Sequence, residues 1–471
     1  MRRAYDVASV RAAEGSALAG LPDGALMQRA AAGLATVCAR LLGRVYGARV
    51  LVLVGSGDNG GDALYGGARL AARGARVEVV LLGSRVHEPG LAALRGAGGR
   101  VVDSVTSVTH PPDLVVDGIT GIGGSGGLRE AAAAAVAALP CTALVVAVDV
   151  PSGVDADTGE VSGPAVRADV TVTFGVLKPG LVIDPGAGHA GVVELIDIGL
   201  DPPDPAPVEV LQAADVAGLL PRPSRESDKY RRGVLGLAAG SDQYTGAAVL
   251  CAGGAIRGGA GMVRYLGADL PTALVRSRWP EVVMGEGRVQ AWAVGSGGGG
   301  DAARHLARAM SDGIPLVVDA DALAAFAELR DHRARALLTP HAGELARLLG
   351  VERADVESAR LAHARRAARE LGAVVLLKGS TTVVAHPDGS VRVNPTRTPA
   401  LGTGGSGDVL AGLCGALLAG GLDPFDAGSV GAWLHGLAGR LAADGGAPVS
   451  AYDVIDHLPA AFRAVTSERS A

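Results

Sequence analysis

The stretch that decides the fold reads Arg49-Val50-Leu51-Val52-Leu53-Val54, followed by Gly55-Ser56-Gly57-Asp58-Asn59-Gly60-Gly61-Asp62. Its first part is short, apolar and rich in β-branched residues, which predicts a buried strand. The glycine-rich part predicts a loop over 55–62, and a helix is predicted from Asp62 to Arg73. A tight glycine turn between a strand and a helix exposes backbone N–H groups that bind phosphate. Around this segment we therefore predict a Rossmann-like α/β domain.

The rest of the first half repeats the alternation of strands and helices. Helical windows at 5–20 and 24–43 precede the deciding strand, and further strands are predicted at 76–82, 113–117, 143–150 and 169–174. Short Val/Leu-rich strands separated by Ala-rich helices favour a parallel sheet covered by helices on both faces. We expect a three-layer N-terminal domain.

A proline cluster separates the two halves of the chain. In the segment Asp201-Pro202-Pro203-Asp204-Pro205-Ala206-Pro207, four prolines prevent both helix and sheet from continuing. A chain of 471 residues is long enough for two or three domains with cores of their own. We place the domain boundary here, with domains at 1–205 and 206–471.

The second half carries a second glycine loop, Gly402-Thr403-Gly404-Gly405-Ser406-Gly407-Asp408. Glycines let the backbone close around a phosphoryl group, Ser406 is predicted to cap the following helix, and Asp408 could take a proton from an attacking hydroxyl. The alternative is a plain helix start, with Asp408 complementing the helix dipole. Strands are predicted at 234–239, 291–295, 315–319, 336–339, 373–378 and 381–385, and the last third is predicted to be helical from Ser406.

Composition excludes several function classes. The net charge of −5 and a pI near 6.1 provide no basic surface for nucleic acid or anionic membranes, so small-molecule partners are expected. No signal peptide is apparent, and the apolar stretch 410–422 is too short to span a bilayer. Four scattered cysteines indicate reduced core thiols in a cytoplasmic protein: Cys38, Cys141, Cys251 and Cys414.

Polar residues follow three predicted strands of the first half. Asn59, Asp117 and the pair Asp149 and Ser152 each stand at or just after the carboxyl end of a strand. Because ligands of open α/β sheets bind at those ends, we expect the four side chains to converge on a site for a hard cation. Alternatively, Asp117 and Asp149 only cap helices or turns.

Lysine and asparagine are rare in this chain, and each of them stands in a segment that looks suited to binding or catalysis. The three lysines are Lys178, Lys229 and Lys378, and the two asparagines are Asn59 and Asn394. Since arginine supplies nearly all other positive charge, the lysines mark places that suit a compact ammonium better than a guanidinium fork. No role is assigned to Lys178 or Lys229 from the residues alone.

The first half resembles the YjeF N-terminal family, the NAD(P)H-hydrate epimerases. The resemblance is carried by Asp-Asn-Gly-Gly-Asp at 58–62, Asp117 before the loop 120–127, Asp149-x-Pro151-Ser152-Gly153 and Lys178-Pro179-Gly180. It implies potassium bound by Asn59, Asp117 and Ser152. Asp149 is the candidate for acid/base work because it ionises near that cation. The resemblance also implies that the hydrated dinucleotide is held by Asp58, Asn59, Gly60, Gly61, Asp62, Gly121, Ile122, Gly123, Gly124, Ser125, Gly126, Gly127 and Asp149.

The second half resembles the YjeF C-terminal family, the ADP-dependent NAD(P)H-hydrate dehydratases of ribokinase-like fold. The motifs are Lys229-Tyr230-x-x-Gly233, Thr339-Pro340-His341-x-Gly343-Glu344, Lys378-Gly379-Ser380-Thr381-Thr382 and the loop 402–408. The resemblance implies that Asp408 deprotonates the substrate hydroxyl, and that Mg²⁺ accompanies ADP. It implies substrate contacts by Ala247, Gly297, His341 and Asp408, and nucleotide contacts by Lys378, Gly379, Ser380, Thr381, Thr382, Gly404 and Gly407.

Together the resemblances imply a bifunctional repair enzyme. It would interconvert the R and S epimers of NAD(P)HX and dehydrate the S epimer with ADP, giving NAD(P)H, AMP and phosphate. We expect a cytoplasmic homo-oligomer whose partners are NAD(P)HX and ADP. The alternative is a ribokinase-like kinase of a small vitamin precursor, fused to a non-catalytic N-terminal binding module.

Overall fold

The computed structural model describes residues 1–222, 224–329, 335–396 and 398–467. It forms two compact units: Arg3–Pro207, and Val208–Ala471 together with Met1–Arg2. The division falls in the proline cluster, two residues after the boundary predicted between 205 and 206. The short strand β1 (Arg2–Ala4) opens the chain.

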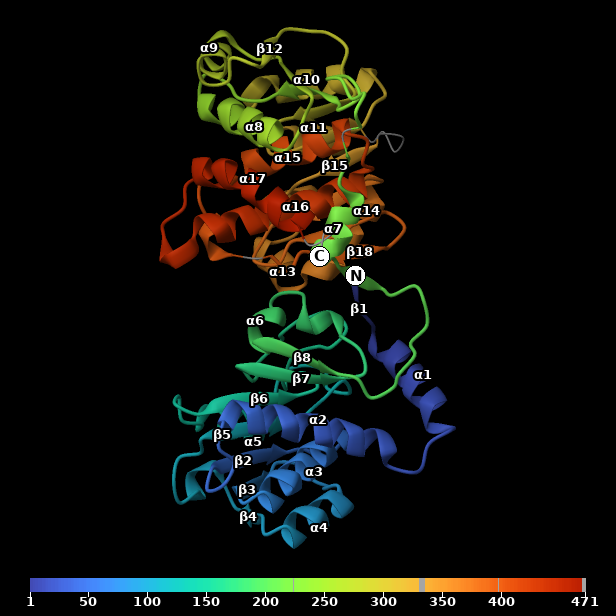
Figure 1. Cartoon of the computed structure of the whole chain (residues 1–471), viewed down its shortest axis with the longest axis vertical. Helices are drawn as coiled ribbons and strands as arrows, with labels where there is room; N and C mark the ends of the chain where they lie inside the picture. The colour runs from blue at the N-terminus through green and yellow to red at the C-terminus, as the bar shows by residue number, and fades with distance from the viewer. Residues whose placement is uncertain (223, 330–334, 397, 468–471) are drawn as a thin grey trace. The chain divides into compact units, whose positions relative to one another are not determined.

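The first unit is built on a seven-stranded sheet with the order β4-β3-β2-β5-β6-β7-β8. All its paired strands are parallel. Figure 1 shows this order from β4 at the bottom of the unit to β8. The five predicted strands are confirmed, whereas β4 and β8 were not predicted. The strands are β2 (Arg49–Val54), β3 (Arg76–Leu81), β4 (Arg100–Val102), β5 (Leu114–Gly118), β6 (Leu144–Val148), β7 (Val170–Phe174) and β8 (Val192–Ile196).

Two apolar cores cover the two faces of this sheet, because successive side chains along a strand such as β2 point to opposite faces. Val50, Val52 and Val54 pack in one core, with helices α2, α3 and α4, while Leu51 and Leu53 pack in the other, with α5. The result is the three-layer arrangement that the sequence predicts. The helices are α1 (Val7–Leu18), α2 (Ala25–Leu42), α3 (Asp58–Ala72), α4 (Glu88–Gly96), α5 (Glu130–Ala137) and α6 (Ala187–Ala190).

Helix α3 begins four residues earlier than predicted. Residues 58–62 form its first turns, and Gly57 precedes it as the N-cap in an extended conformation. A Cβ at Gly60 would lie 2.6 Å from the Gly55 carbonyl oxygen, and one at Gly61 would lie 2.9 Å from Met27 Cε. These glycines therefore allow close helix packing, which a sequence pattern does not distinguish from a loop.

The second unit contains a longer sheet with the order β9-β18-β17-β16-β15-β14-β13-β10-β11-β12. Only β17 is antiparallel to its neighbours among these pairs of described strands. The six predicted strands are confirmed. The strands are β9 (Val208–Val210), β10 (Val234–Ala238), β11 (Met262–Tyr265), β12 (Val283–Met284), β13 (Ala291–Val294), β14 (Leu316–Val318), β15 (Ala336–Leu338), β16 (Val374–Leu377), β17 (Val383–Ala385) and β18 (Val391–Val393).

Helices cover both faces of this sheet as well. On one face α8, α15, α16 and α17 share a large apolar core with the strands, and on the other α10 packs on β13 and α14 on β16. The helical last third is confirmed. The helices are α7 (Ala213–Leu219), α8 (Thr245–Arg257), α9 (Asp269–Arg278), α10 (Ala302–Ser311), α11 (Ala322–Leu329), α12 (Ala342–Leu349), α13 (Arg353–Ser358), α14 (Arg360–Leu371), α15 (Ser406–Ala419), α16 (Pro424–Ala442) and α17 (Ala451–Ser467).

Two local predictions are wrong. Ser406 is not the N-cap of α15: Gly405 holds that position with φ 86°, and the Ser406 hydroxyl donates to the Leu401 carbonyl instead. Cys141 is exposed, because it follows Pro140 in the turn before β6, whereas the other three cysteines are buried. Among the described residues, no helix combines the length and apolar character needed to cross a bilayer.

Candidate active sites

In the first unit, Asp117 and Ser152 meet behind the ends of β5 and β6. The Asp117 carboxylate is fully buried and accepts hydrogen bonds from the Ser152 hydroxyl at 2.6 Å and the Ser152 amide at 2.9 Å. The Thr120 amide donates to the Ser152 hydroxyl at 2.9 Å. Burial raises the pKa of Asp117 to about 6, against the lowering effect of the Ser152 hydrogen bonds.

Asn59 reaches the same region from the first turn of α3. A Cβ at Gly121 would lie 2.9 Å from Asn59 Oδ1, so the loop that follows β5 passes directly over the Asn59 side chain. The Asn59 Nδ2 group is buried and has no hydrogen-bond partner among the described residues. The structure thus brings together the ends of β2, β5 and β6, as the sequence predicts for parallel strands.

Asp149 is paired with a buried lysine. Lys178 Nζ lies 2.5 Å from Asp149 Oδ1 and donates to Thr173 Oγ1 and to the Phe174 carbonyl, both at 3.0 Å. The Lys178 side chain is only 1% exposed. Asp149 has a φ of 67°, a conformation uncommon for a residue other than glycine and often found at functional sites. Lys178 therefore holds the carboxylate in place.

Further carboxyl groups surround this ion pair. Burial, and then the charges of Asp149 and Asp58, raise the pKa of Asp62 well above its ordinary value. Asp62 Oδ1 is buried with no hydrogen-bond partner in the part of the chain that the structure describes. Burial and the charge of Asp149 likewise raise the pKa of Glu14 on α1. Glu14 was missed in the sequence, although an acidic residue four positions after buried Val10 lies on the inner face of the helix.

The predicted substrate loop 121–127 lies beside these groups. A Cβ at Gly123 would lie 3.5 Å from Arg11 Nη2, and one at Gly127 would lie 2.7 Å from Gly163 Cα. Ile122 is partly buried against an apolar cluster, whereas Ser125 and Gly126 are exposed. Part of the loop is therefore packed against the protein, and the rest is exposed and accessible to a ligand.

In the second unit, Asp408 stands in the first turn of α15 near Lys378. Burial and the negative charge of Asp319 raise the pKa of Asp408 to about 7, and the charge of Lys378 opposes this rise. A Cβ at Gly407 would lie 3.3 Å from Lys378 Nζ, so the missing side chain leaves room for the ammonium at the helix start. The predicted base, lysine and glycine loop thus come together.

Lys378 is held at the end of β16 by acidic residues. Its Nζ donates to Asp319 Oδ1 at 2.9 Å and lies 3.9 Å from Glu344 Oε2. Burial disfavours the charge, but Asp319 and Glu344 outweigh it and raise the pKa of Lys378. Arg360 donates to the Lys378 carbonyl at 2.7 Å and packs where a Gly379 side chain would stand. Asp319 and Arg360 were missed in the sequence.

His341 caps helix α12 at the neighbouring strand end. Its Nδ1 accepts from the amides of Gly343 at 3.0 Å and Glu344 at 3.2 Å, while Glu344 accepts from the His341 amide at 2.7 Å. Partial burial lowers the pKa of His341. Because Nδ1 accepts hydrogen bonds, the proton of the neutral ring is on Nε2, which lies 3.4 Å from Glu344 Oε1, and the side chain is half exposed.

The remaining predicted residues lie around this centre. A Cβ at Gly297, whose φ is 58°, would lie 2.7 Å from Ala247 Cβ, so these two predicted substrate residues touch. Gly404 and Ser380 are exposed, Thr382 is partly buried and Thr381 is buried. Lys229 lies exposed, 5.4 Å from the centre of the ring of its neighbour Tyr230.

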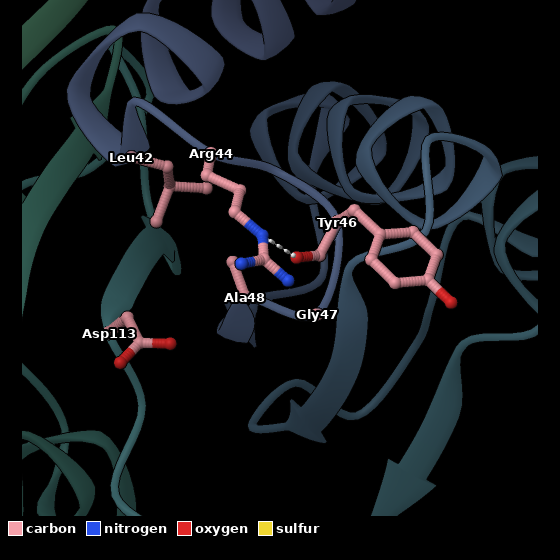
Figure 2. Close-up of a pocket in the computed structure, with 6 residues that line it drawn as sticks. All are labelled: Leu42, Arg44, Tyr46, Gly47, Ala48 and Asp113. Atoms are coloured by element: carbon pink, nitrogen blue, oxygen red, sulfur yellow. Dashed lines mark hydrogen bonds between the residues drawn. The ribbon is translucent and has the colours of Figure 1, made fainter.

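A surface pocket lies at the other end of the first sheet. Leu42, Arg44, Tyr46, Gly47, Ala48 and Asp113 line it, and Arg44 donates to the Tyr46 carbonyl within it (Figure 2). It is next to the amino ends of β2 and β5, whereas Asn59 and Asp117 follow the carboxyl ends. The pocket is therefore not part of the candidate site.

Comparisons with known proteins follow the same division of the chain. A family model described as YjeF-related protein N-terminus matches residues 23–180, and one described as NAD(P)H-hydrate dehydratase matches residues 235–460. A bifunctional NAD(P)H-hydrate repair enzyme Nnr of Mycobacterium leprae is 47% identical, covering 99% of this chain and all of that protein. The enzyme of the same name from Mycobacterium tuberculosis H37Rv is 49% identical over 91% of each chain. A ribokinase-like protein from Enterococcus faecalis superposes with a TM-score of 0.50 and 23% identity, covering 56% of this chain and 99% of its own.

Proposed function

The chain belongs to the family of bifunctional NAD(P)H-hydrate repair enzymes, and from this membership we propose how its two units divide the repair. The first unit epimerises hydrated NAD(P)H at its C6 hydroxyl, with Asp149 as acid/base. The second unit dehydrates the S epimer with ADP, with Asp408 as base. The observation that carries the proposal is the meeting of Asp408, Lys378 and Gly407 at one helix start.

In the dehydratase step, Asp408 takes the proton of the C6 hydroxyl as its oxygen attacks the terminal phosphorus of ADP. The new P–O bond forms while the bond to AMP breaks. The C6–O bond then breaks with loss of phosphate, and a proton leaves C5 to restore the dihydropyridine. A carboxylate with a pKa near neutrality suits this proton transfer, because a large share of it is ionised at pH 7 and that form is still basic.

The nucleotide binds between the ends of β16 and α15. Lys378 supplies a compact positive charge, and the backbone amides at the start of α15 face the phosphates. Mg²⁺ neutralises phosphate charge when bound. Among the described residues there is no cluster of three or more His, Cys, Asp or Glu side chains that could hold a metal.

The epimerase site fits a potassium ion. Asn59, Asp117 and Ser152 offer amide, carboxylate and hydroxyl oxygens, the ligand type that a hard cation needs. The buried Nδ2 of Asn59 has no acceptor within the described ranges, and a half-turn of this amide would place its oxygen there instead. Bound there, the cation would offset the negative charge of the surrounding carboxyl groups.

The variant Asp408→Asn tests the assignment. It keeps the side-chain shape and removes the base, so turnover of the S epimer with ADP should fall by roughly 10²–10⁴-fold while nucleotide affinity is largely kept. Turnover is followed by recovery of NADH absorbance, and nucleotide affinity by calorimetry. Near-normal turnover would remove Asp408 from the mechanism.

A further inference from the structure

Asp319 occupies the centre of the dehydratase site, although neither the motifs nor the mechanism above gives it a role. It follows β14 directly, and the next residue, Ala320, has a φ of 47°. Such a conformation is unfavourable for a residue with a side chain, and persists where the surroundings require it. This turn directs Asp319 inward, while exposed Asp321 accepts from the Gly299 amide at 2.9 Å.

Three side chains from three neighbouring strand ends bind the Asp319 carboxylate. Lys378 Nζ and Thr339 Oγ1 donate to Oδ1 at 2.9 and 2.8 Å, and Ser296 Oγ donates to Oδ2 at 2.8 Å. Asp319 is 2% exposed. These three donors hold the buried carboxylate in one position, so Lys378 also has one preferred position.

The charge of Asp319 also acts on Asp408. The groups that face Asp408 are Asp319, Lys378 and the buried thiol of Cys251, while Glu344 reaches the site through Lys378. Asp319 makes protonation of Asp408 easier and Lys378 makes it harder. Burial raises the pKa of Asp408 most, and the charges of Asp319 and Lys378 then act on it in opposite directions.

We propose that Asp319 is a positioning residue of the dehydratase: it fixes the Lys378 ammonium beside Gly407 for the nucleotide phosphates, and its charge acts on the base Asp408. This proposal rests on the function proposed above. A residue that only filled the core would affect stability, whereas this role also affects the pH dependence of turnover and the use of ADP.

The test measures kcat/KM for the S epimer at saturating ADP and Mg²⁺ from pH 5.5 to 9, and KM for ADP. In Asp319→Asn, the acid limb of the profile, where kcat/KM falls as the pH drops, should lie about one pH unit lower than in the wild type. The charge that raises the basicity of Asp408 is gone in this variant. KM for ADP should rise several-fold. Asp321→Asn is the matched control, since the same change two residues away should leave the acid limb in place.

The variant Asp319→Glu distinguishes the effect of the negative charge at residue 319 from the effect of its exact position. It keeps the negative charge but lengthens the side chain, so the acid limb should stay and KM for ADP should rise. If Asp319→Asn does not fold, Asp319→Glu decides, and an unchanged KM for ADP would overturn the proposal. In folded Asp319→Asn, an acid limb that stays at the wild-type pH would overturn it.

Comparison with Asp408→Asn keeps the two proposals apart. Equal turnover by wild type and Asp408→Asn would refute the role of Asp408 as the base, on which the proposal for Asp319 rests. If Asp408→Asn is inactive but the acid limb of the pH profile of Asp319→Asn stays at the wild-type pH, only the role of Asp319 is refuted.

Discussion

Replacing Asp149 by asparagine should stop epimerisation and also destabilise the first unit. The left-handed backbone at this position, with φ 67°, is tolerated by asparagine better than by alanine. The change therefore tests the carboxylate rather than the turn. Its main structural effect is on Lys178, which is 1% exposed and loses its charged partner 2.5 Å away.

The size of the stability loss follows from that burial. Removing one partner of a buried ion pair lowers the free energy of unfolding by about 3–5 kcal/mol, because the remaining charge is uncompensated. Replacing both partners by uncharged groups often changes stability little. We therefore expect Asp149→Asn to lower the free energy of unfolding by about that amount. The double variant Asp149→Asn/Lys178→Met should recover much of the loss, which denaturant titration followed by circular dichroism would measure.

Epimerase activity should not recover in the double variant. With mixed epimers and ADP, it should convert the S epimer at the normal initial rate and then slow sharply, because the R epimer must wait for spontaneous interconversion. Adding residues 1–205 as a separate protein should restore full conversion. Complete single-phase conversion by the double variant alone would refute the catalytic role of Asp149 and the division of labour.

Three further predictions concern the second unit and the thiols. Dehydration of the S epimer should fall as the pH drops below about 7, since the pKa of Asp408 is raised to about 7 and only the ionised carboxylate can act as base; a flat pH profile between 5.5 and 8 would contradict this. Lys378→Arg should raise KM for ADP although charge is kept, because the wider guanidinium does not fit beside Gly407; unchanged KM would show that ammonium shape is unimportant. Under native conditions a thiol reagent should modify Cys141 and spare Cys38, Cys251 and Cys414, as mass spectrometry would reveal, and rapid labelling of Cys38 would be inconsistent with its burial.

Most of the strands could be predicted from the sequence because their signals are local. A run such as Arg49–Val54 specifies a buried strand by itself, and parallel strands necessarily bring their carboxyl ends to one edge. This is why Asn59, Asp117 and Ser152 could be grouped from positions far apart in the chain. The edge strands β4 and β8 were missed, since their exposed residues weaken the apolar pattern.

The partners of the charged residues could not be predicted, because they depend on which strand ends become neighbours. Lys178 was noticed as a rare lysine, but its pairing with Asp149 follows from the path of the chain after β7. Asp319 gives no motif signal, and only the order β13-β14-β15-β16 places it between Ser296, Thr339 and Lys378. Similarly, the start of α3 depended on contacts of Gly60 and Gly61 made at a distance in the sequence.

The most direct test of the account supplies the whole chain with mixed R and S epimers of NADHX, ADP and Mg²⁺, and follows absorbance at 340 nm together with free phosphate. The account predicts recovery of all the NADH in one continuous phase, with one phosphate and one AMP formed for each NADH. Accumulation of a phosphorylated dinucleotide without free phosphate would indicate a kinase, and a halt after the S epimer is consumed would show that the first unit is not an epimerase.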